Sequence, residues 1–342
     1  MTASGFPVGK LPAEFLGALL SRLPKADPRV VVGPRVGEDA AVIDFGSTYL
    51  VAKTDPITFA TDLIGWYAVN INANDIACMG ARPRWFLATA LLPEGIEPPA
   101  VEAIFNQLTE ACAKIGVTLV GGHTEVTYGL DRPVIVGCML GEVSPEGLVT
   151  SAGARPGDVI VVTKGIAIEG TAVLAREAAD LLRQRGVPET VIDRARNFLF
   201  DPGISVVQDA AVAREAVPVT AFHDPTEGGL AAGLLEVGLA SGVGFEVEAG
   251  KVPVLPECRL ICDALGLDPL GLLASGSLLV TVPAQAAPDL LSALERAGIP
   301  AAVIGRVLPA EAGYRLLTPD GPKPWPRFER DEVARFYESR SA

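Results

Sequence analysis

The sequence predicts a two-domain protein of mixed α+β and α/β structure, with an N-terminal domain over 1–153 and a C-terminal domain over 154–342. Its 342 residues exceed the size at which a single hydrophobic core usually stops growing. Short strand-like runs and helical periods alternate irregularly, which favours a mixed sheet over a strictly parallel one. The segment 151–158 is rich in turn residues and poor in apolar ones, so we place the domain boundary there.

Helical periodicity and glycine or proline breaks define the elements of the first domain. Apolar side chains repeat with a helical period over 11–23, 62–79 and 99–115. Gly80 suits the C-terminal cap of the second helix, and Pro83 prevents its continuation. Apolar or β-branched runs predict strands at 30–32, 40–45, 49–54, 85–92, 117–120 and 134–143.

The second domain opens with a strand and then a helix. Strands are predicted at 159–163, 217–222, 278–282 and 301–304, and helices at 172–185, 188–198, 205–215, from 229 onwards, and at 286–297. The tail from Asp320 is rich in proline, arginine and aromatic residues, and we expect an irregular extension there.

Composition excludes several classes of function. The net charge of −13, with 28 basic residues, argues against a general binder of nucleic acid or anionic membranes. No apolar stretch reaches the length of a membrane span, and the N-terminus lacks a charged segment that leads into an apolar one. We therefore expect a cytoplasmic protein with reduced thiols. Cys258 and Cys262 could share a helix face, but two soft ligands make a poor metal site.

Acidic residues beside predicted strands carry the strongest functional signal. Asp39 lies in a turn before a strand and Asp55 ends the strand 49–54. Carboxylates at such positions suit hard cations, although a turn aspartate can also accept backbone hydrogen bonds. Asp75 lies inside the helix 62–79, in a segment without basic residues, and burying it is costly unless it faces water or a metal.

Amides on the same helix give a polar stripe. Asn70 and Asn74 are spaced i, i+4 and so share a face. They could line a nucleotide site, or they could serve as caps or members of a core hydrogen-bond network.

The two histidines of the chain stand in glycine-containing clusters at predicted strand ends. In the first cluster, Gly121 and Gly122 let backbone N–H groups approach an anion, and His123 and Glu125 share a strand face. A structural role is the alternative for each histidine.

In the second cluster His223 and Asp224 precede Thr226, Glu227, Gly228 and Gly229, in the order strand, acidic turn, glycine pair, helix. The helix N-terminus could hold phosphate while Asp224 shares a cation with it. Neither a P-loop nor a dinucleotide fingerprint is present.

Together these segments resemble the superfamily of aminoimidazole ribonucleotide (AIR) synthase, formylglycinamide ribonucleotide amidotransferase, thiamine-monophosphate kinase, selenophosphate synthetase and HypE. The resemblance covers about 33–276 and is carried by Gly-Glu-Asp-Ala-Ala, Thr-Asp, Asn-Asp-Ile-Ala-Cys-Met-Gly-Ala-Arg-Pro and His-Asp-Pro-Thr-Glu-Gly-Gly-Leu. Asp224-Pro225-Thr226 followed by Gly228-Gly229, and Ala274-Ser275-Gly276, favour HypE. Gly65-Trp66 together with Asn74-Asp75-Ile76-Ala77 is also similar to thiamine-monophosphate kinase.

The resemblance implies a homodimer whose N-terminal sheets pair, a C-terminal α/β sandwich-like domain, and ATP and Mg²⁺ between the domains. By this resemblance we assign Asp39, Asp55 and Asp75 to the metal. Catalytic roles are assigned to Lys53, His123, Glu125 and Asp224, and nucleotide contacts to Gly37, Asn74, Gly121, Gly122, Thr226, Gly228 and Gly229.

Three departures limit the comparison. His123 stands where relatives usually have an acidic residue, so either His123 or Glu125 could supply that ligand, and Glu227 stands where HypE has arginine. HypE ends in a cysteine that carries the carbamoyl group, whereas this sequence ends in Ser-Ala. Selenophosphate synthesis is disfavoured because no cysteine lies near a glycine-rich N-terminus.

The sequence therefore predicts a Mg²⁺- and ATP-dependent, HypE-like enzyme that phosphorylates, or phosphorylates and dehydrates, an amide- or carboxylate-bearing acceptor. That acceptor is a small molecule or a protein tail. The alternatives are a small-molecule kinase of the thiamine-monophosphate type and a non-catalytic nucleotide-binding partner protein.

Overall fold

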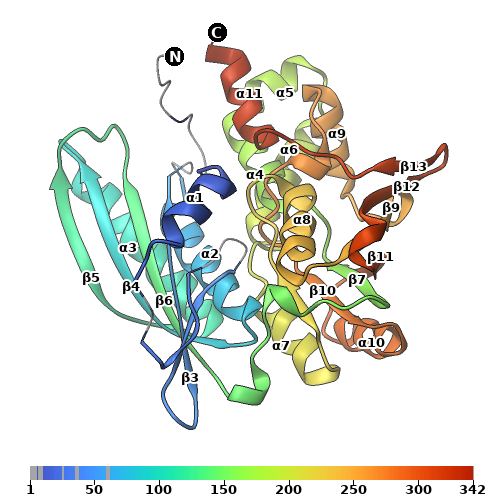
Figure 1. Ribbon diagram of the computed structural model, residues 1–342. Helices are drawn as coiled ribbons and strands as arrows, with labels where there is room; N and C mark the ends of the chain where they lie inside the picture. Colours follow the sequence, from blue (N-terminus) through green and yellow to red (C-terminus); the bar gives the residue numbers. More distant parts are fainter. Residues whose placement is uncertain (1–5, 7–10, 25–26, 35–37, 59–61, 342) are drawn as a thin grey trace, which may run out of the picture.

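The first half of the chain builds a six-stranded sheet (Figure 1). The structure is a computed structural model that describes residues 6, 11–24, 27–34, 38–58 and 62–341. In order across the sheet the strands are β1 (Val30–Val32), β2 (Ala41–Asp44), β3 (Tyr49–Ile57), β6 (Val134–Val143), β4 (Arg82–Pro93) and β5 (Thr118–Thr127). β4 and β5 are parallel and the other neighbours antiparallel, which confirms the mixed sheet.

Helix α2 (Ile64–Cys78) lies at the centre of the molecule. Every residue of α2 except Ile71 is buried, because α3 (Pro98–Ile115) and the first sheet cover part of it and the second half of the chain covers the rest. A helix enclosed in this way shows little amphipathic pattern. Gly65 lets α3 approach closely, since a Cβ there would lie 2.8 Å from the backbone oxygen of Ile104. The short helix α1 (Ala13–Leu20) precedes the sheet.

The second half of the chain builds a seven-stranded sheet with helices on both faces. Its strands, in order, are β13 (Gly321–Pro324), β12 (Tyr314–Thr318), β9 (Gly244–Glu248), β11 (Ala301–Leu308), β7 (Asp158–Thr163), β10 (Leu279–Pro283) and β8 (Ala221–His223). The helices are α4 (Ile168–Glu177), α5 (Ala179–Gln184), α6 (Glu189–Arg196), α7 (Val207–Ala216), α8 (Gly229–Ser241), α9 (Pro256–Leu265), α10 (Ala287–Arg296) and α11 (Glu332–Ser341).

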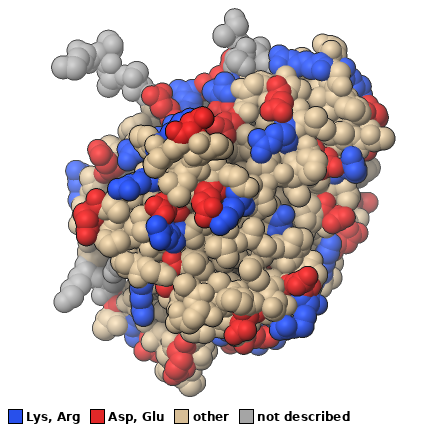
Figure 2. Space-filling model, turned by 90° about the vertical axis from the view of Figure 1, so that its right-hand side faces the viewer, with Lys and Arg blue, Asp and Glu red and all other residues tan. Residues whose placement is uncertain are grey.

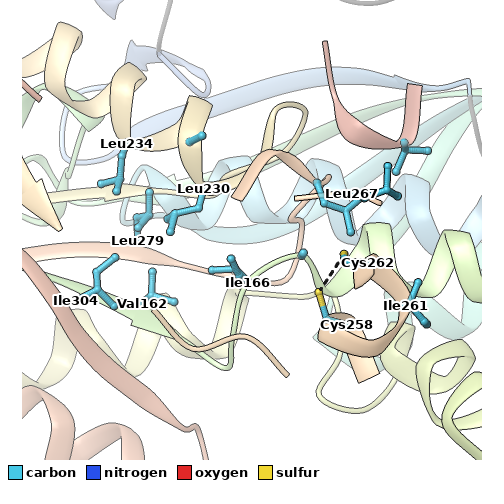
Figure 3. Packing of buried hydrophobic residues seen from close by; sticks show 14 of the residues in the cluster. Val162, Ile166, Leu230, Leu234, Cys258, Ile261, Cys262, Leu267, Leu279 and Ile304 are labelled. Atoms are coloured by element: carbon cyan, nitrogen blue, oxygen red, sulfur yellow. Dashed lines mark hydrogen bonds between the residues drawn. The ribbon is translucent and has the colours of Figure 1, made fainter. Parts of the chain in front are cut away.

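Alternation along β7 shows why this domain is an α/β sandwich. Ile160 and Val162 face the cluster that includes side chains of α4, α8 and α9, part of which Figure 3 shows. Val161 points the other way, toward α7 and α10. Both faces of the strand are therefore buried, and the strand reads as an unbroken apolar run. The expected sandwich-like domain is confirmed.

Two predicted strands are longer than expected, and this moves functional residues. The strand predicted at 49–54 continues to Ile57, so Asp55 lies within β3 rather than at its end. The strand predicted at 117–120 continues to Thr127, so the Gly121–Glu125 cluster lies inside an edge strand. In both cases pairing with a neighbouring strand extends the element past residues that would break it in isolation.

The expectation of an irregular tail from Asp320 is wrong. The tail contains β13, which pairs with β12, and helix α11, whose Val333 and Phe336 join the core of the second sheet. Strands β9 and β12 were also not predicted. β12 is parallel to β9 and pairs with β13 on its other side, so contacts distant in sequence specify it.

The end of α2 joins the two halves of the molecule. Ala77 and Cys78 pack with Val206 and Phe222 of the second half in one apolar cluster. We propose the domain boundary at 153/154, between the last strand of the first sheet and the first strand of the second.

On the face in Figure 2, acidic and basic side chains are interspersed. Among the described residues, no helix combines the length and apolar character needed to cross a bilayer.

Candidate functional site

Four carboxylates predicted from sequence converge where the two halves of the chain meet. Asp39 precedes β2, Asp55 lies on β3, Asp75 on α2, and Asp224 directly after β8. Asp39, Asp75 and Asp224 are buried, with 8%, 6% and 2% of their surface exposed. Lys53 stands among them on β3: its Nζ lies 3.2 Å from Oδ2 of Asp75 and 3.7 Å from Oδ2 of Asp55.

Lys53 corrects the expectation that Asp75 has no cation nearby. The lysine comes from the facing strand, a contact that spacing along α2 does not reveal. Burial by itself would lower the pKa of Lys53, but the surrounding carboxylates, first Asp75 and then Asp55, raise it well above its ordinary value. Lys53 therefore stays charged and can face phosphate as well as carboxylate.

A buried chain of hydrogen bonds holds Asp39 in place. Nδ1 of His223 lies 3.1 Å from Oδ1 of Asp39, Nε2 of His223 lies 2.8 Å from Oε2 of Glu236, and the Ser151 hydroxyl donates to Oδ2 of Asp39 over 3.1 Å. Burial opposes charge on His223, but Asp39 and Glu236 raise its pKa well above the ordinary value. Burial likewise opposes charge on Asp39, but His223 holds the pKa of that carboxyl below its usual range. Asp39 is thus ionised at neutral pH and is available to a cation.

Asp75 and Asp224 are left short of partners. Burial and then Asp39 raise the pKa of Asp224 to about 7. Burial raises the pKa of Asp75 well above its ordinary value, although Lys53 opposes this. Oδ2 of Asp224 is buried without a hydrogen bond, and Oδ2 of Asp75 accepts none despite its closeness to Lys53. Cys78 donates its thiol to Oδ1 of Asp224, with Sγ and oxygen 3.4 Å apart.

This donor set fits a hard divalent cation. Four carboxyl groups face two positive side chains, Lys53 and His223, and burial together with mutual repulsion raises the pKa of two of them, Asp75 and Asp224. Unpaired carboxylate oxygens in a buried site are costly unless a cation completes them. Asp39, Asp55 and Asp75 remain our proposal for the ligands of that cation, and the geometry leads us to add Asp224 to them.

Asn74 serves as a clamp between the two halves. Its Nδ2 donates to the Ile204 carbonyl oxygen over 2.8 Å and its Oδ1 accepts from the Val206 amide over 2.8 Å. Both ends of the side-chain amide therefore bind the loop before α7. This geometry favours the core-network alternative for Asn74 over a nucleotide contact, while Asn70 bonds back to the Trp66 carbonyl oxygen of its own helix.

The turn before α8 differs from the predicted phosphate cradle. The Gly228 amide donates to Oδ2 of Asp331 over 2.8 Å, and the Gly229 amide donates to the carbonyl oxygen of Thr226. The expectation that these two N–H groups are free is therefore wrong. Asp331, from the tail before α11, caps this end of α8 in place of an anion.

His123 and Glu125 contact one another but lie apart from the carboxylates. His123 Nε2 lies 3.0 Å from Oε2 of Glu125, and both side chains are exposed on edge strand β5. Gly122 on β5 pairs with β4, whose partner β6 pairs with Asp55, so three strand spacings, or about 14 Å, separate the two groups.

Of the two glycines in β5, Gly122 has a structural role. A Cβ on Gly122 would lie 1.9 Å from the Ala88 carbonyl oxygen, so this glycine permits close pairing with β4. A Cβ on Gly121 would meet nothing within 4 Å. The expectation that this pair stands at a strand end is wrong. Gly37, also assigned to the nucleotide, lies outside the described residues.

Glu169 belongs near the site although the sequence did not single it out. It lies in the first turn of α4 with 5% of its surface exposed, and its Oε2 makes no hydrogen bond, nor does the hydroxyl of nearby Ser275. Burial raises the pKa of Glu169 to about 7. The nearby Ser275 hydroxyl lowers this pKa, and the negative charge of Asp331 raises it further. One signal was present: Glu169 is the single charged residue in the run 165–175.

Comparison with known families shows to which family this chain belongs. The sequence model of the AIR synthase related protein N-terminal domain matches 37–143, and that of the C-terminal domain matches 155–316. The chain belongs to the AIR synthase related family. Within this family it is HypE-like: carbamoyl dehydratase HypE of Cupriavidus necator is 34% identical over 270 residues, or 76% of this chain and 73% of that protein. HypE of Escherichia coli is 31% identical, covering 82% and 83% of the two chains.

Solved structures of family members share the fold. HypE in complex with ATP has a TM-score of 0.71 at 25% identity, covering 93% of this chain and 91% of that one. HypE in a HypE–HypF complex has a TM-score of 0.72 at 26% identity, covering 86% and 94%. A thiamine-monophosphate kinase complexed with AMPPCP and TMP has a TM-score of 0.68 at 24% identity, covering 86% and 91%, a likeness of fold.

Proposed function

We propose that this protein is a HypE-like, ATP- and Mg²⁺-dependent enzyme that phosphorylates and dehydrates an amide-bearing acceptor. The observation that carries the proposal is the buried group of Asp39, Asp75 and Asp224, in which one oxygen of Asp75 and one of Asp224 accept no hydrogen bond. HypE relatives are named carbamoyl dehydratases, and a HypE of this fold has been solved with ATP.

Dehydration of a carbamoyl group explains the need for ATP. The amide oxygen attacks the γ-phosphorus as the bond to ADP breaks, and the oxygen becomes part of a good leaving group. Loss of phosphate together with two N–H protons then leaves a nitrile. Such transfer depends on positioning and on stabilisation of charge rather than on covalent catalysis.

Residues of both domains have distinct tasks in this scheme. His223 and Ser151 hold Asp39 ionised and oriented, so that its carboxylate is ready to bind a cation. Lys53 remains positively charged within reach of the same space and can neutralise phosphate oxygens. Bound Mg²⁺ would supply further neutralisation of charge on the transferring phosphoryl group.

Glu169 is our candidate for the acceptor side of the site. Its pKa of about 7 lets it take up a proton at neutral pH, which the loss of amide protons requires. The preceding loop carries left-handed backbone at Lys164 and Ala167, with φ of 62° and 57°. Non-glycine residues rarely adopt this conformation, and it occurs most often where a functional group must be held in place.

The homodimer is also part of the proposal. Edge strand β5 exposes side chains on both faces, including Val120 and Val126 at 52% and 58%, and Tyr128 directly after the strand is 93% exposed. A long strand edge with apolar side chains is usually covered by another chain. In a dimer that pairs these strands, His123 and Glu125 would lie at the interface.

The alternatives have less support. A kinase of the thiamine-monophosphate type is supported by likeness of fold and by the segments 65–66 and 74–77, which identify no phosphate acceptor. A non-catalytic nucleotide-binding protein has no use for a proton acceptor such as Glu169, though it would retain the cation site.

Calorimetry and product analysis test the proposal together. Purified protein should bind a non-hydrolysable ATP analogue in a Mg²⁺-dependent manner, and small carboxamides and carbamates should stimulate release of ADP and phosphate. Stimulation by monophosphates instead would favour the kinase, and binding without turnover of any carboxamide or carbamate would favour the non-catalytic protein. Absence of Mg²⁺-dependent binding would refute all three readings.

A further inference from the structure

Cys78 lies against the carboxylate site and has no part in the function proposed above. It is the last residue of α2, one turn after Asp75, and so lies on the same side of the helix. Its side chain is completely buried. Among the described residues, one group of His, Cys, Asp or Glu side chains brings three ligand atoms within 4.8 Å of one another, and its members are Asp39, Cys78 and Asp224.

A second observation indicates that something binds at this group. Oδ2 of Asp224 is buried without a hydrogen bond, while Oδ1 of the same carboxyl accepts the thiol of Cys78 over 3.4 Å. A buried acceptor without a hydrogen bond destabilises the folded protein unless a bound group completes it. His223 and Ser151 orient the Asp39 carboxylate, and Cys78 and Asp224 are hydrogen-bonded to one another. These contacts hold the three ligand groups close together before any ion binds.

We propose that Asp39, Cys78 and Asp224 form a mixed oxygen and sulfur site that selects a thiophilic divalent cation of the Zn²⁺ class. Magnesium takes oxygen ligands and gains nothing from sulfur, whereas thiolate sulfur favours zinc and its heavier relatives. Three protein ligands leave a fourth tetrahedral position, which water or a phosphate oxygen can fill.

The chemistry of binding is simple. The Cys78 thiol releases its proton to solvent as the sulfur–metal bond forms, and no redox partner takes part. The sulfur site shares two carboxylates, Asp39 and Asp224, with the magnesium site proposed above and does not otherwise depend on the proposed function. Its consequence is competition: a soft cation at Cys78 occupies Asp39 and Asp224 and displaces the magnesium proposed there.

Cys258 and Cys262 lie in a different environment from Cys78. Sγ of Cys258 and Sγ of Cys262 lie 4.0 Å apart within the apolar core of the second domain, as Figure 3 shows. They share a helix face as expected, but no carboxylate joins them in a group of three ligand atoms among the described residues. Their contribution to metal binding can be measured separately by substitution of Cys258.

Cadmium titration of the metal-free, full-length protein tests the site. Cd²⁺ reports thiolate binding through an ultraviolet charge-transfer absorption. The absorption is expected in the wild-type protein, reduced by one thiolate in Cys78→Ala, and retained at the Cys78 site in Cys258→Ala and in the buried control Cys112→Ala. Zn²⁺ affinity should fall at least about tenfold in Cys78→Ala, as expected when a metal site loses a supporting group.

Two outcomes separate this inference from the proposed function. If Cys78→Ala gives the same charge-transfer absorption as wild type, the sulfur site does not exist, whatever Mg²⁺–ATP binding shows. If that absorption is lost in Cys78→Ala but wild type fails to bind Mg²⁺ and the ATP analogue, the sulfur site stands and the proposed function falls. Cys78→Ser keeps the size of the side chain and serves if the alanine variant does not fold.

Discussion

Replacing Asp75 by asparagine is the sharpest test of the carboxylate site. The change keeps shape and removes one negative charge beside Lys53, whose Nζ lies 3.2 Å from the carboxylate. At an effective dielectric constant near 20, that attraction is about 5 kcal/mol before desolvation is counted. Burial nevertheless raises the pKa of Asp75 well above its ordinary value, so desolvation and neighbouring carboxylates outweigh the attraction. Without metal, Asp75→Asn should therefore be as stable as wild type or slightly more stable.

The effect with metal should be opposite. A cation present at 100 times its dissociation constant stabilises the folded protein by about 2.7 kcal/mol. At roughly 1–2 °C for each kcal/mol in a chain of this length, this corresponds to an increase of about 3–5 °C in melting temperature. Asp75→Asn should lose most of this increase because one ligand charge is gone. The assay is thermal unfolding across a Mg²⁺ titration with a non-hydrolysable ATP analogue.

The matched control for this experiment is Asp131→Asn, which removes the same charge from an exposed turn. It should retain the full wild-type increase. Asp55→Asn provides a second test at a less buried member of the site. The reasoning is refuted if Asp75→Asn keeps the wild-type metal response, or if it loses several kcal/mol of stability without metal.

Three further predictions follow from the same geometry. The pKa of Asp224 is raised to about 7, so this group keeps its proton in the folded protein at pH values where the unfolded chain has lost it. The stability of the metal-free protein should therefore fall as the pH rises from about 4 to 7. Mg²⁺ should then stabilise the protein more at pH 8 than at pH 5.5 in thermal unfolding, and equal stabilisation would contradict this. Glu236→Gln should lower the pKa of His223 measured by NMR, and an unchanged pKa of His223 would contradict the proposed hydrogen-bond chain. Glu169→Gln should reduce acceptor-stimulated ADP release at least about tenfold while leaving affinity for the ATP analogue intact; equal losses in both would make Glu169 a binding or structural residue.

Local sequence patterns predicted the helices and strands that are buried on all sides, because their composition is mainly apolar. The helix predicted at 62–79 is α2, and the apolar run at 159–163 is the central strand β7, because both are enclosed on all sides and show it in composition. The mixed sheet was predictable from the irregular order of strands and helices, and the α/β sandwich from the resemblance to the family. The acidic motifs also named Asp39, Asp55, Asp75 and Asp224 correctly as neighbours, although residues 39 and 224 are far apart in sequence.

Tertiary structure decided which groups these carboxylates meet. Lys53 reaches Asp75 across a strand-to-helix contact, and Asp331 from the mispredicted tail takes the Gly228 amide that was expected to face phosphate. His123 looked like a site residue because glycines surround it, yet extended pairing with β4 places it about three strand spacings away. Residue type and local pattern determine which side chains can bind a cation. Only the packing of α2 against β3 and β8 determines which of them share one, because electrostatic interactions depend on distance in space and not along the chain.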